Sequence, residues 1–314
     1  MPAWIPAVRF MLAMQRKGGK SPHEVEDAPA VAVGGVPVRC RRFAPRGRPR
    51  GRVLVLHGVT PRGVDDPRMA LLADSLAAAG FEVIAPEFVG LSRAELTPAT
   101  VGEIREVIAG LGPDVRVLAP SFAAGLCLRA VAEGAEVRSV CAIGGYSDVR
   151  ASLGRLLSRD VDAYARVAVV LNLGHLDPVE CEALRVWLYD DSVRPVERRF
   201  PAVHATLPPG ARERVDGIVD GSWPDLVHWF DQIPDVVDAI DVASVAAQIR
   251  VPVVLIHGAT DRVIPPAESI QLAARLPRAH LCVTALLSHG DAKSPAEQPR
   301  AVLGLARAFA EFLG

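Results

Sequence analysis

The chain has 314 residues, half of them apolar, and its 35 basic and 36 acidic side chains leave a formal net charge of −1. This length predicts one large domain with an insertion, and the near-neutral charge gives no reason to expect a nucleic acid as partner. The five cysteines lack zinc-ligand spacing and no phosphate-binding glycine loop occurs, so no metal or cofactor is expected. Their scattered positions favour a reducing, cytoplasmic compartment.

Residues 1–30 are predicted to form a separate N-terminal segment. Its first 14 residues are apolar, but the stretch lacks a basic start and Arg9 interrupts it. This pattern is not that of a signal peptide or an integral membrane segment. We expect an amphipathic helix that packs on the protein, for example over the mouth of the functional site, and a membrane surface is the alternative.

An arginine-rich stretch follows at residues 41–52, where proline and glycine are frequent. We interpret it as a solvated loop joining the first strands, and an anion-binding patch is the alternative. Its six arginines are Arg41, Arg42, Arg46, Arg48, Arg50 and Arg52.

Strands and helices alternate in the next part of the chain, which predicts an α/β fold with a mostly parallel sheet covered on both faces. The expected strands lie near 52–57, 82–85, 115–119 and 137–143, and the expected helices near 66–80, 98–111 and 122–134.

The alternation stops for about a hundred residues before a strand pattern resumes at Val251. Structureless loops of this length are rare in compact domains, so residues 148–248 are predicted to be a helical insertion. The insertion is rich in large apolar side chains, most of which we expect to pack it on the core, while one or two line an apolar pocket. These residues are Trp187, Tyr189, Trp223, Leu226, Val227, Trp229 and Phe230.

Ser121 is the strongest candidate for a catalytic residue. It follows a predicted strand, precedes a predicted helix, and has small residues, Ala119 and Ala123, two positions to either side. This is the order of a nucleophile elbow, in which a strained turn exposes the serine hydroxyl. Ser75 and Ser92 match the same spacing, but Ser75 is predicted on a helix surface and Ser92 has no strand directly before it. A buried turn serine is the structural alternative for Ser121.

A nucleophilic serine needs a base and a group that orients the base. His289 follows the apolar run 281–287, and Asp261 follows the strand pattern that begins at Val251. The chain order serine, aspartate, histidine is that of α/β-hydrolases. Asp148, which follows another predicted strand, is a rival acid, and an aspartate after a strand can also be a turn residue or a helix cap.

The ordered set of motifs resembles an α/β-hydrolase-fold serine hydrolase of the esterase or lipase type with a helical cap. The resemblance covers most of residues 30–314 and rests on the His57-Gly58 turn, the segment 80–88, the elbow and the acid loop 258–265. The chain departs from the usual pattern in having alanine rather than glycine at both small elbow positions, and Pro120 before the serine.

The resemblance and the motifs together assign roles to the candidate residues. Ser121 is expected to attack, His289 to act as base, and Asp261 to orient it. The oxyanion is expected to be bound by the backbone N–H of Phe122 and, as the resemblance implies, by that of Val59. His57 and Gly58 are expected to hold the oxyanion loop rather than to take part in the chemistry.

We therefore predict an esterase-like enzyme acting on a small-molecule acyl substrate. A thioesterase or C–C-bond hydrolase would use the same triad, and a non-catalytic ligand-binding protein on this fold is an alternative from another class. The core is predicted at residues 31–147 and 249–314, with the cap at 148–248. The sequence leaves the oligomeric state open.

Overall fold

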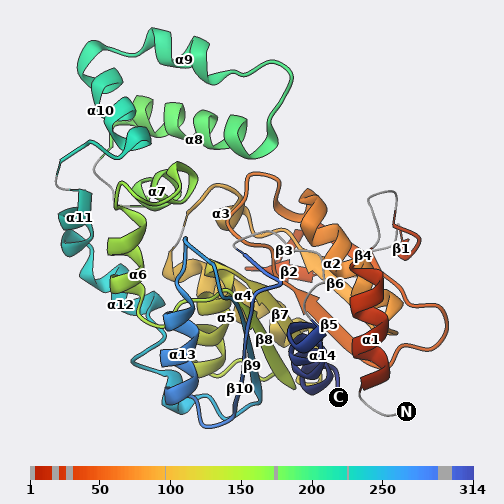
Figure 1. The fold of residues 1–314 in the computed structure, drawn as a ribbon. Coiled ribbons are helices and arrows are strands. Elements are labelled where there is room, and N and C mark those ends of the chain that lie inside the picture. The colour runs from red at the N-terminus through yellow and green to blue at the C-terminus, as the bar shows by residue number, and fades with distance from the viewer. Residues whose placement is uncertain are drawn as a thin grey trace.

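The computed structural model describes residues 4–15, 21–25, 31–95, 97–172, 176–224, 226–288 and 299–314. An eight-stranded sheet runs through the molecule in the order β1–β4–β6–β5–β7–β8–β9–β10 (Figure 1). The pairings β1–β4 and β4–β6 are antiparallel, and all pairings from β6 to β10 are parallel. The strands are β1 (Glu24–Val25), β4 (Cys40–Phe43), β5 (Arg52–Val55), β6 (Glu82–Pro86), β7 (Arg116–Pro120), β8 (Ser139–Ile143), β9 (Val253–Gly258) and β10 (Ala279–Thr284). A hairpin of β2 (Val31–Val33) and β3 (Val36–Val38) lies outside this sheet.

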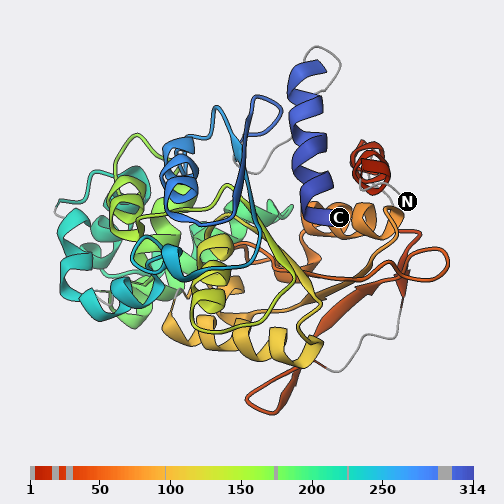
Figure 2. The same cartoon turned by 90° about the horizontal axis from the view of Figure 1, so that it is seen from below.

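Helices cover both faces of the sheet, because strands with apolar side chains on both sides must be buried on both sides. Figure 2 shows α1, α2 and α14 on one face and α4 on the other. Each face has its own cluster of buried apolar side chains. The covering helices are α1 (Trp4–Ala13), α2 (Pro67–Ala78), α4 (Pro98–Leu111), α5 (Phe122–Ala132), α13 (Pro266–Arg275) and α14 (Pro299–Leu313), and the short α3 (Val89–Ser92) follows β6. The predicted α/β class and alternation are confirmed, with strand ends shifted by up to about two residues, as is usual at strand boundaries.

The N-terminal helix α1 packs on the protein, against α2 and α14. The ring centroids of Phe10 and Phe309 lie 4.2 Å apart, and Ala7, Phe10 and Ala13 are buried. The described part of the N-terminal segment is therefore a layer of the fold on the face of α14.

The interpretation of residues 41–52 as one solvated loop is wrong at three of its arginines. Arg41 and Arg42 belong to β4 and Arg52 begins β5. Arg41 donates two hydrogen bonds to Glu24, of 2.7 and 2.8 Å, and both Arg42 and Arg52 pair with Glu82. Charged side chains at this edge of the sheet are matched across strands, which sequence spacing did not indicate.

Between β8 and β9, the described residues form helices and no strand. These helices are α6 (Val149–Leu156), α7 (Ala163–Val170), α8 (Pro178–Val193), α9 (Phe200–Thr206), α10 (Pro209–Asp220), α11 (Leu226–Trp229) and α12 (Pro234–Ile240). We call this set the inserted helices. In Figure 1, α7 to α10 extend beyond one end of the sheet. Buried Arg166 on α7 joins the loop before that helix to α10. Its guanidinium donates hydrogen bonds to the carbonyls of Ser158 and Val161 in the loop and of Ile218 and Val219 in α10.

Candidate active site

Ser121 lies between β7 and α5 in a backbone conformation that L-residues rarely adopt. Its φ is 54° and its ψ is −134°. Such a conformation costs about 1–3 kcal/mol and persists only where the surroundings enforce it. The Ser121 N–H donates to the Ile143 carbonyl over 2.7 Å, and the Ala124 N–H donates to the Ser121 carbonyl over 3.0 Å. The strain is therefore held from both sides, by the end of β8 and by the first turn of α5.

Close packing around the turn depends on two glycines, Gly125 and Gly145, that no sequence pattern indicated. A Cβ atom on Gly125 would overlap the buried ring of Tyr146, and one on Gly145 would lie 2.8 Å from Cβ of Ala124. Ala119 and Ala123 are fully buried, which fits the expectation that only small residues are accommodated there. The tightest approach, however, is between α5 and the segment that follows β8.

The loop after β5 lies against the serine. A Cβ atom on Gly58 would lie 3.8 Å from Cβ of Ser121. On the other side of the serine, the first N–H groups of a helix lack intrahelical partners, and Phe122 is the first residue of α5. The expected oxyanion donors, Val59 and Phe122, therefore come from the two segments that flank Ser121.

His57 is fully buried and holds this loop through its two ring nitrogens. The Phe88 N–H donates to Nε2 over 2.9 Å, so Nδ1 carries the proton and donates to the Gly58 carbonyl, 2.8 Å away. Burial lowers the pKa of the His57 imidazole. A neutral imidazole with both nitrogens engaged supports the expected structural role of His57.

The inserted helices also contact the oxyanion loop. The Tyr164 hydroxyl on α7 donates to the Val59 carbonyl over 2.9 Å, between residues 105 positions apart in the chain. Arg62 in the same loop donates to the Val193 carbonyl at the end of α8 over 2.8 Å. The inserted helices thus help to set the backbone orientation of the loop that holds Val59.

Asp261 is buried at the end of the turn that follows β9. Its Oδ1 accepts hydrogen bonds from the N–H groups of Val263 and Ile264, at 2.9 and 3.0 Å. Its Oδ2 lies 3.6 Å from the position of a Cβ on Gly144. Because Gly144 follows Ile143, which accepts from Ser121, one short turn after β8 lies between the serine and the carboxylate.

His257, the penultimate residue of strand β9, is a buried histidine near this carboxylate. Its Nε2 lies 2.8 Å from the Ile264 carbonyl and its Nδ1 2.6 Å from the Ser269 hydroxyl. A carbonyl can only accept, so Nε2 carries the proton and Nδ1 accepts from Ser269. The Nε2 to Asp261 Oδ2 distance is 3.7 Å, beyond a hydrogen bond. His257 therefore supports the acid loop rather than supplying a base.

Asp148, the rival acid, has a structural role at the start of α6. Its side chain accepts from the Ala151 N–H over 2.9 Å as the N-cap of that helix. Asp148 is therefore a helix cap, which is the structural alternative stated for an aspartate after a strand.

His289, the expected base, lies outside the described residues. The chain leading to it is described as far as Ser288. A Cβ atom on Gly258 would lie 2.5 Å from the Leu287 carbonyl oxygen and 3.1 Å from Cα of Ser288. Ser288, the residue before His289, therefore lies beside Gly258 at the end of β9. Gly258 is three positions before Asp261 in the sequence.

The two rival serines belong to helices. Ser75 lies on α2, but the prediction of a surface position is wrong, because the residue is fully buried and donates to the Leu71 carbonyl over 2.7 Å. Ser92 ends α3 and donates to Glu87. Both hydroxyls serve local packing and hydrogen bonding.

The cysteines offer no competing nucleophile of low pKa. Cys127, Cys141 and Cys282 are buried, as expected of small core residues. Burial raises the pKa of Cys127 to about 12 and that of half-buried Cys40 to about 11. Thiols with such pKa values remain protonated and unreactive near neutral pH.

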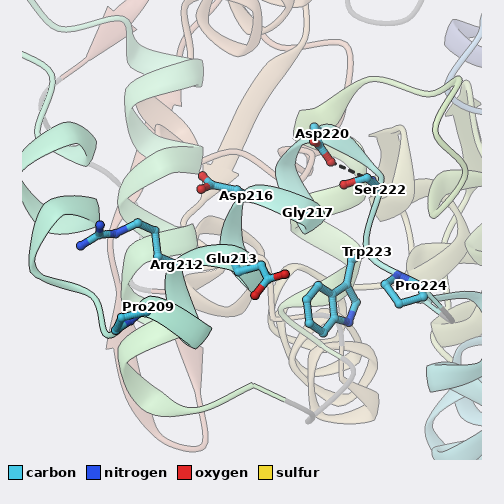
Figure 3. A pocket seen from close by; sticks show the side chains of 9 residues that line it. All are labelled: Pro209, Arg212, Glu213, Asp216, Gly217, Asp220, Ser222, Trp223 and Pro224. Carbon is cyan, nitrogen blue, oxygen red and sulfur yellow. Dashed lines mark hydrogen bonds between the residues drawn. The ribbon is translucent and has the colours of Figure 1, made fainter.

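A cavity of about 680 Å³ lies along α10, as Figure 3 shows. Its lining is mixed, with four charged residues, Arg212, Glu213, Asp216 and Asp220, beside the aromatic ring of Trp223. The sequence predicted that one or two large apolar residues of the insertion line an apolar pocket. Trp223 does line this cavity, but charged side chains surround it. Arg214 covers the Trp223 ring, its guanidinium carbon 5.4 Å from the ring centroid.

Most of the other aromatic residues of the insertion serve packing. Trp187 and Trp229 are half-buried against the core cluster, and Tyr189 is 38% exposed. The side chains of Val227 and Phe230 lie outside the described set. Within the described ranges, no cluster of His, Cys, Asp and Glu could hold a metal ion, and no helix is long and apolar enough to cross a membrane.

No family model and no curated protein matches the chain. Solved structures do match. An esterase from Pyrococcus furiosus has a TM-score of 0.56 at 14% identity, with 95% of this chain and 96% of that chain covered. A meta-cleavage product hydrolase from Pseudomonas fluorescens has a TM-score of 0.50 at 19% identity, covering 91% and 97%. An acylaminoacyl peptidase from Pyrococcus horikoshii reaches 0.51 at 11% identity, covering 92% of this chain and 40% of that chain.

At such low identity, these similarities establish the fold and do not identify a substrate. They agree with the mostly parallel eight-stranded sheet flanked by helices. The chain adopts the α/β-hydrolase fold.

Proposed function

We propose that the protein is a serine hydrolase that cleaves a carboxylic ester or a related acyl bond with Ser121 as nucleophile. The observation that carries the proposal is the strained conformation of Ser121, with φ of 54° at a strand-to-helix turn. Strained conformations of non-glycine residues cluster at active sites, where the strain can be part of the mechanism. A buried turn serine would not need a conformation that costs free energy.

In the proposed reaction, His289 takes the proton of the Ser121 hydroxyl while Oγ attacks the substrate carbonyl carbon. The carbonyl π electrons move to oxygen, and the oxyanion accepts hydrogen bonds from the N–H groups of Phe122 and Val59. The tetrahedral species collapses, the bond to the leaving group breaks, and His289 protonates that group. Water then attacks the acyl-enzyme by the same steps, which releases the acid and restores Ser121.

Asp261 is proposed to orient His289 and to stabilise the imidazolium. Its Oδ1 already accepts two backbone N–H groups, which fixes the orientation of the carboxylate. Asp148 is occupied as the cap of α6. These bonds favour Asp261 over Asp148 as the acid.

The inserted helices are proposed to form a cap that selects the substrate. We place this cap at residues 148–248, the core at 31–147 and 249–314, and the N-terminal amphipathic segment at 1–30, although its helix α1 and strand β1 pack and pair with the core. Support comes from the two hydrogen bonds by which the insertion contacts the loop of Val59. A cap that contacts the oxyanion loop can change both the shape of the pocket and the orientation of the loop.

Covalent labelling with a fluorophosphonate tests the nucleophile. We expect the wild-type protein to be labelled and Ser121→Ala to remain unlabelled. Ser92→Ala is the matched control, because Ser92 has the same sequence spacing, and this variant should label normally. Absence of labelling of the wild-type protein would favour a non-catalytic ligand-binding protein.

A panel of p-nitrophenyl esters of graded chain length tests the substrate class. Turnover that varies with acyl length would support an esterase. If the protein is labelled by the fluorophosphonate but turns over none of these esters, a thioester or a C–C bond becomes the better candidate. The two experiments thus separate the nucleophile from the bond that it attacks.

A further inference from the structure

Helix α1 has apolar side chains on two sides, and only one of these sides is buried against the rest of the protein. Ala7, Phe10 and Ala13 are buried against α2 and α14. On the other side, Trp4 and Leu12 are 60% and 61% exposed, and Val8 between them is 38% exposed. Their four-residue spacing aligns these three side chains along one face of the helix. We call Trp4, Val8 and Leu12 the Trp4 stripe.

An arginine-rich loop borders this helix. Residues 44–51 connect β4 to β5 and contain the exposed residues Arg46, Arg48 and Arg50. Arg46 lines the same cavity as Arg9 of α1, a space of about 430 Å³, so the loop and the helix lie side by side. We call Arg9, Arg46, Arg48 and Arg50 the arginine group.

The arginine group differs from the other arginines of its stretch. Arg41, Arg42 and Arg52 pair with Glu24 and Glu82. No acidic residue of the described chain forms an ion pair with the arginine group, and neither residues 4–15 nor 44–51 contain an aspartate or glutamate. The exposed apolar stripe is therefore flanked by positive charge that the described fold leaves unmatched.

We propose that this face docks the protein onto the surface of an anionic lipid bilayer. The Trp4 stripe enters the interface between headgroups and acyl chains, where tryptophan is preferred. The arginine group binds lipid phosphates, and each basic side chain near an anionic surface adds to the attraction. With ten residues, α1 is half of the roughly 20 residues needed to cross a bilayer, so it lies in the plane of the surface.

Charge favours a bilayer over a second copy of the chain. A twofold dimer through the same face brings identical patches together, so two arginine groups would approach each other without acidic partners. A nucleic acid would match the charge, but its phosphates would leave the Trp4 stripe in water. A bilayer of anionic lipid satisfies both the apolar stripe and the positive group.

Docking by this face leaves the inserted helices free. In both Figure 1 and Figure 2, α1 lies at the end of the molecule opposite α8 to α10. The proposal therefore does not depend on the proposed hydrolase activity, and either can fail without the other.

Flotation of the full-length protein with lipid vesicles tests the docking. We expect it to float with vesicles of phosphatidylcholine mixed with phosphatidylglycerol, and not with phosphatidylcholine alone. High salt should weaken binding, because screening reduces surface attraction. Arg46→Gln with Arg48→Gln and Arg50→Gln should lower the partition coefficient about a hundredfold, and Trp4→Ser with Leu12→Ser by more than about tenfold.

Matched variants outside the proposed docking face control for charge and hydrophobicity. Arg198→Gln with Arg199→Gln and Arg278→Gln removes the same charge, and Val196→Ser with Ile270→Ser removes exposed apolar side chains. Both should float like the wild type. Quenching of Trp4 fluorescence by brominated lipid, absent in Trp4→Phe, checks insertion without relying on a destabilising change. Three outcomes would overturn the proposal. The first is that the wild-type protein does not float with the anionic vesicles, and the second is that Trp4→Ser with Leu12→Ser binds them as strongly as the wild type. The third outcome is a dimer of the wild-type protein that Trp4→Ser with Leu12→Ser dissociates.

Discussion

The sheet and the inserted helices are stabilised in different ways. Around Ser121, the strands pair through backbone hydrogen bonds and bury side chains such as Leu54, Val117 and Ala119 completely. The inserted helices share the same apolar cluster, but hydrogen bonds to single backbone carbonyls also join them to loops of the core. Tyr164 donates to Val59, and Asn172 donates to Ala94 over 2.5 Å. The sheet thus holds the proposed nucleophile and acid, while the insertion contacts the loop beside them.

If the sheet carries the chemistry, changes to the triad should have the largest effect. We expect His289→Ala to lower kcat by about 10⁶ and Asp261→Asn by about 10⁴. Asp148→Ala should leave kcat nearly unchanged and cost about 1 kcal/mol of stability as a lost helix cap. Steady-state kinetics and urea denaturation measure the two effects. A large loss of kcat in Asp148→Ala, with Asp261→Asn active, would reverse the assignment of the acid.

The close approach behind the elbow should make the sheet region intolerant of a single methyl group. Gly125→Ala places a Cβ in the Tyr146 ring, and we expect a loss of about 3 kcal/mol in the free energy of unfolding. Gly110→Ala on α4 is the control, because nothing lies within 4 Å of its Cβ, and it should stabilise by about 1 kcal/mol. Equal effects of the two changes in urea denaturation would contradict the packing argument.

The link from the insertion to the oxyanion loop should affect rate more than stability. Tyr164→Phe removes the hydrogen bond to the Val59 carbonyl, and we expect stability to fall by about 1 kcal/mol. We expect kcat to fall about tenfold with little change in KM, since a misplaced oxyanion donor weakens the transition state selectively. Tyr189→Phe on α8 is the matched control. An unchanged kcat, or a change in KM alone, would remove Tyr164 from the positioning of this loop.

Acid should weaken the sheet region through His57. Burial lowers the pKa of this imidazole in the folded protein, so the unfolded chain binds a proton first as the pH falls below about 6.5. The free energy of unfolding is therefore unaffected by His57 above that pH. It decreases as the pH falls towards the lowered pKa of the folded protein, because the unfolded chain is protonated first. We expect a loss of about 1 kcal/mol between about pH 7.5 and 5.5. His57→Gln should lack this component in urea titrations, and an equal pH dependence would contradict it.

The local structure around Ser121 and Asp261, the described members of the candidate site, could be predicted because its sequence signals are local. The apolar run before Ser121, the small residues beside it and the following helix lie within about a dozen positions, and the structure reproduces that order. The acid loop shows the same local logic, since Asp261 binds the N–H groups two and three residues later. Patterns of this kind are visible in sequence because the interacting groups are neighbours in the chain.

Other features could not be predicted because they join distant segments. The burial of Ser75, the pairing of Arg42 and Arg52 with Glu82, and the Tyr164–Val59 hydrogen bond all depend on which elements pack together. Alternation of strands and helices does not specify those neighbours. The two halves of the proposed docking face, α1 and the loop 44–51, likewise lie far apart in sequence.

By itself, the sequence determined the class of fold, the order of its elements and the turn that strains Ser121, because hydrophobic periodicity and turn chemistry act over short distances. Only the tertiary structure decided which carbonyls the inserted helices contact and which glycines tolerate no side chain. It also decided which arginines are matched by acidic partners. Those outcomes depend on close packing between elements, where a single methyl group or a single hydrogen bond changes the result.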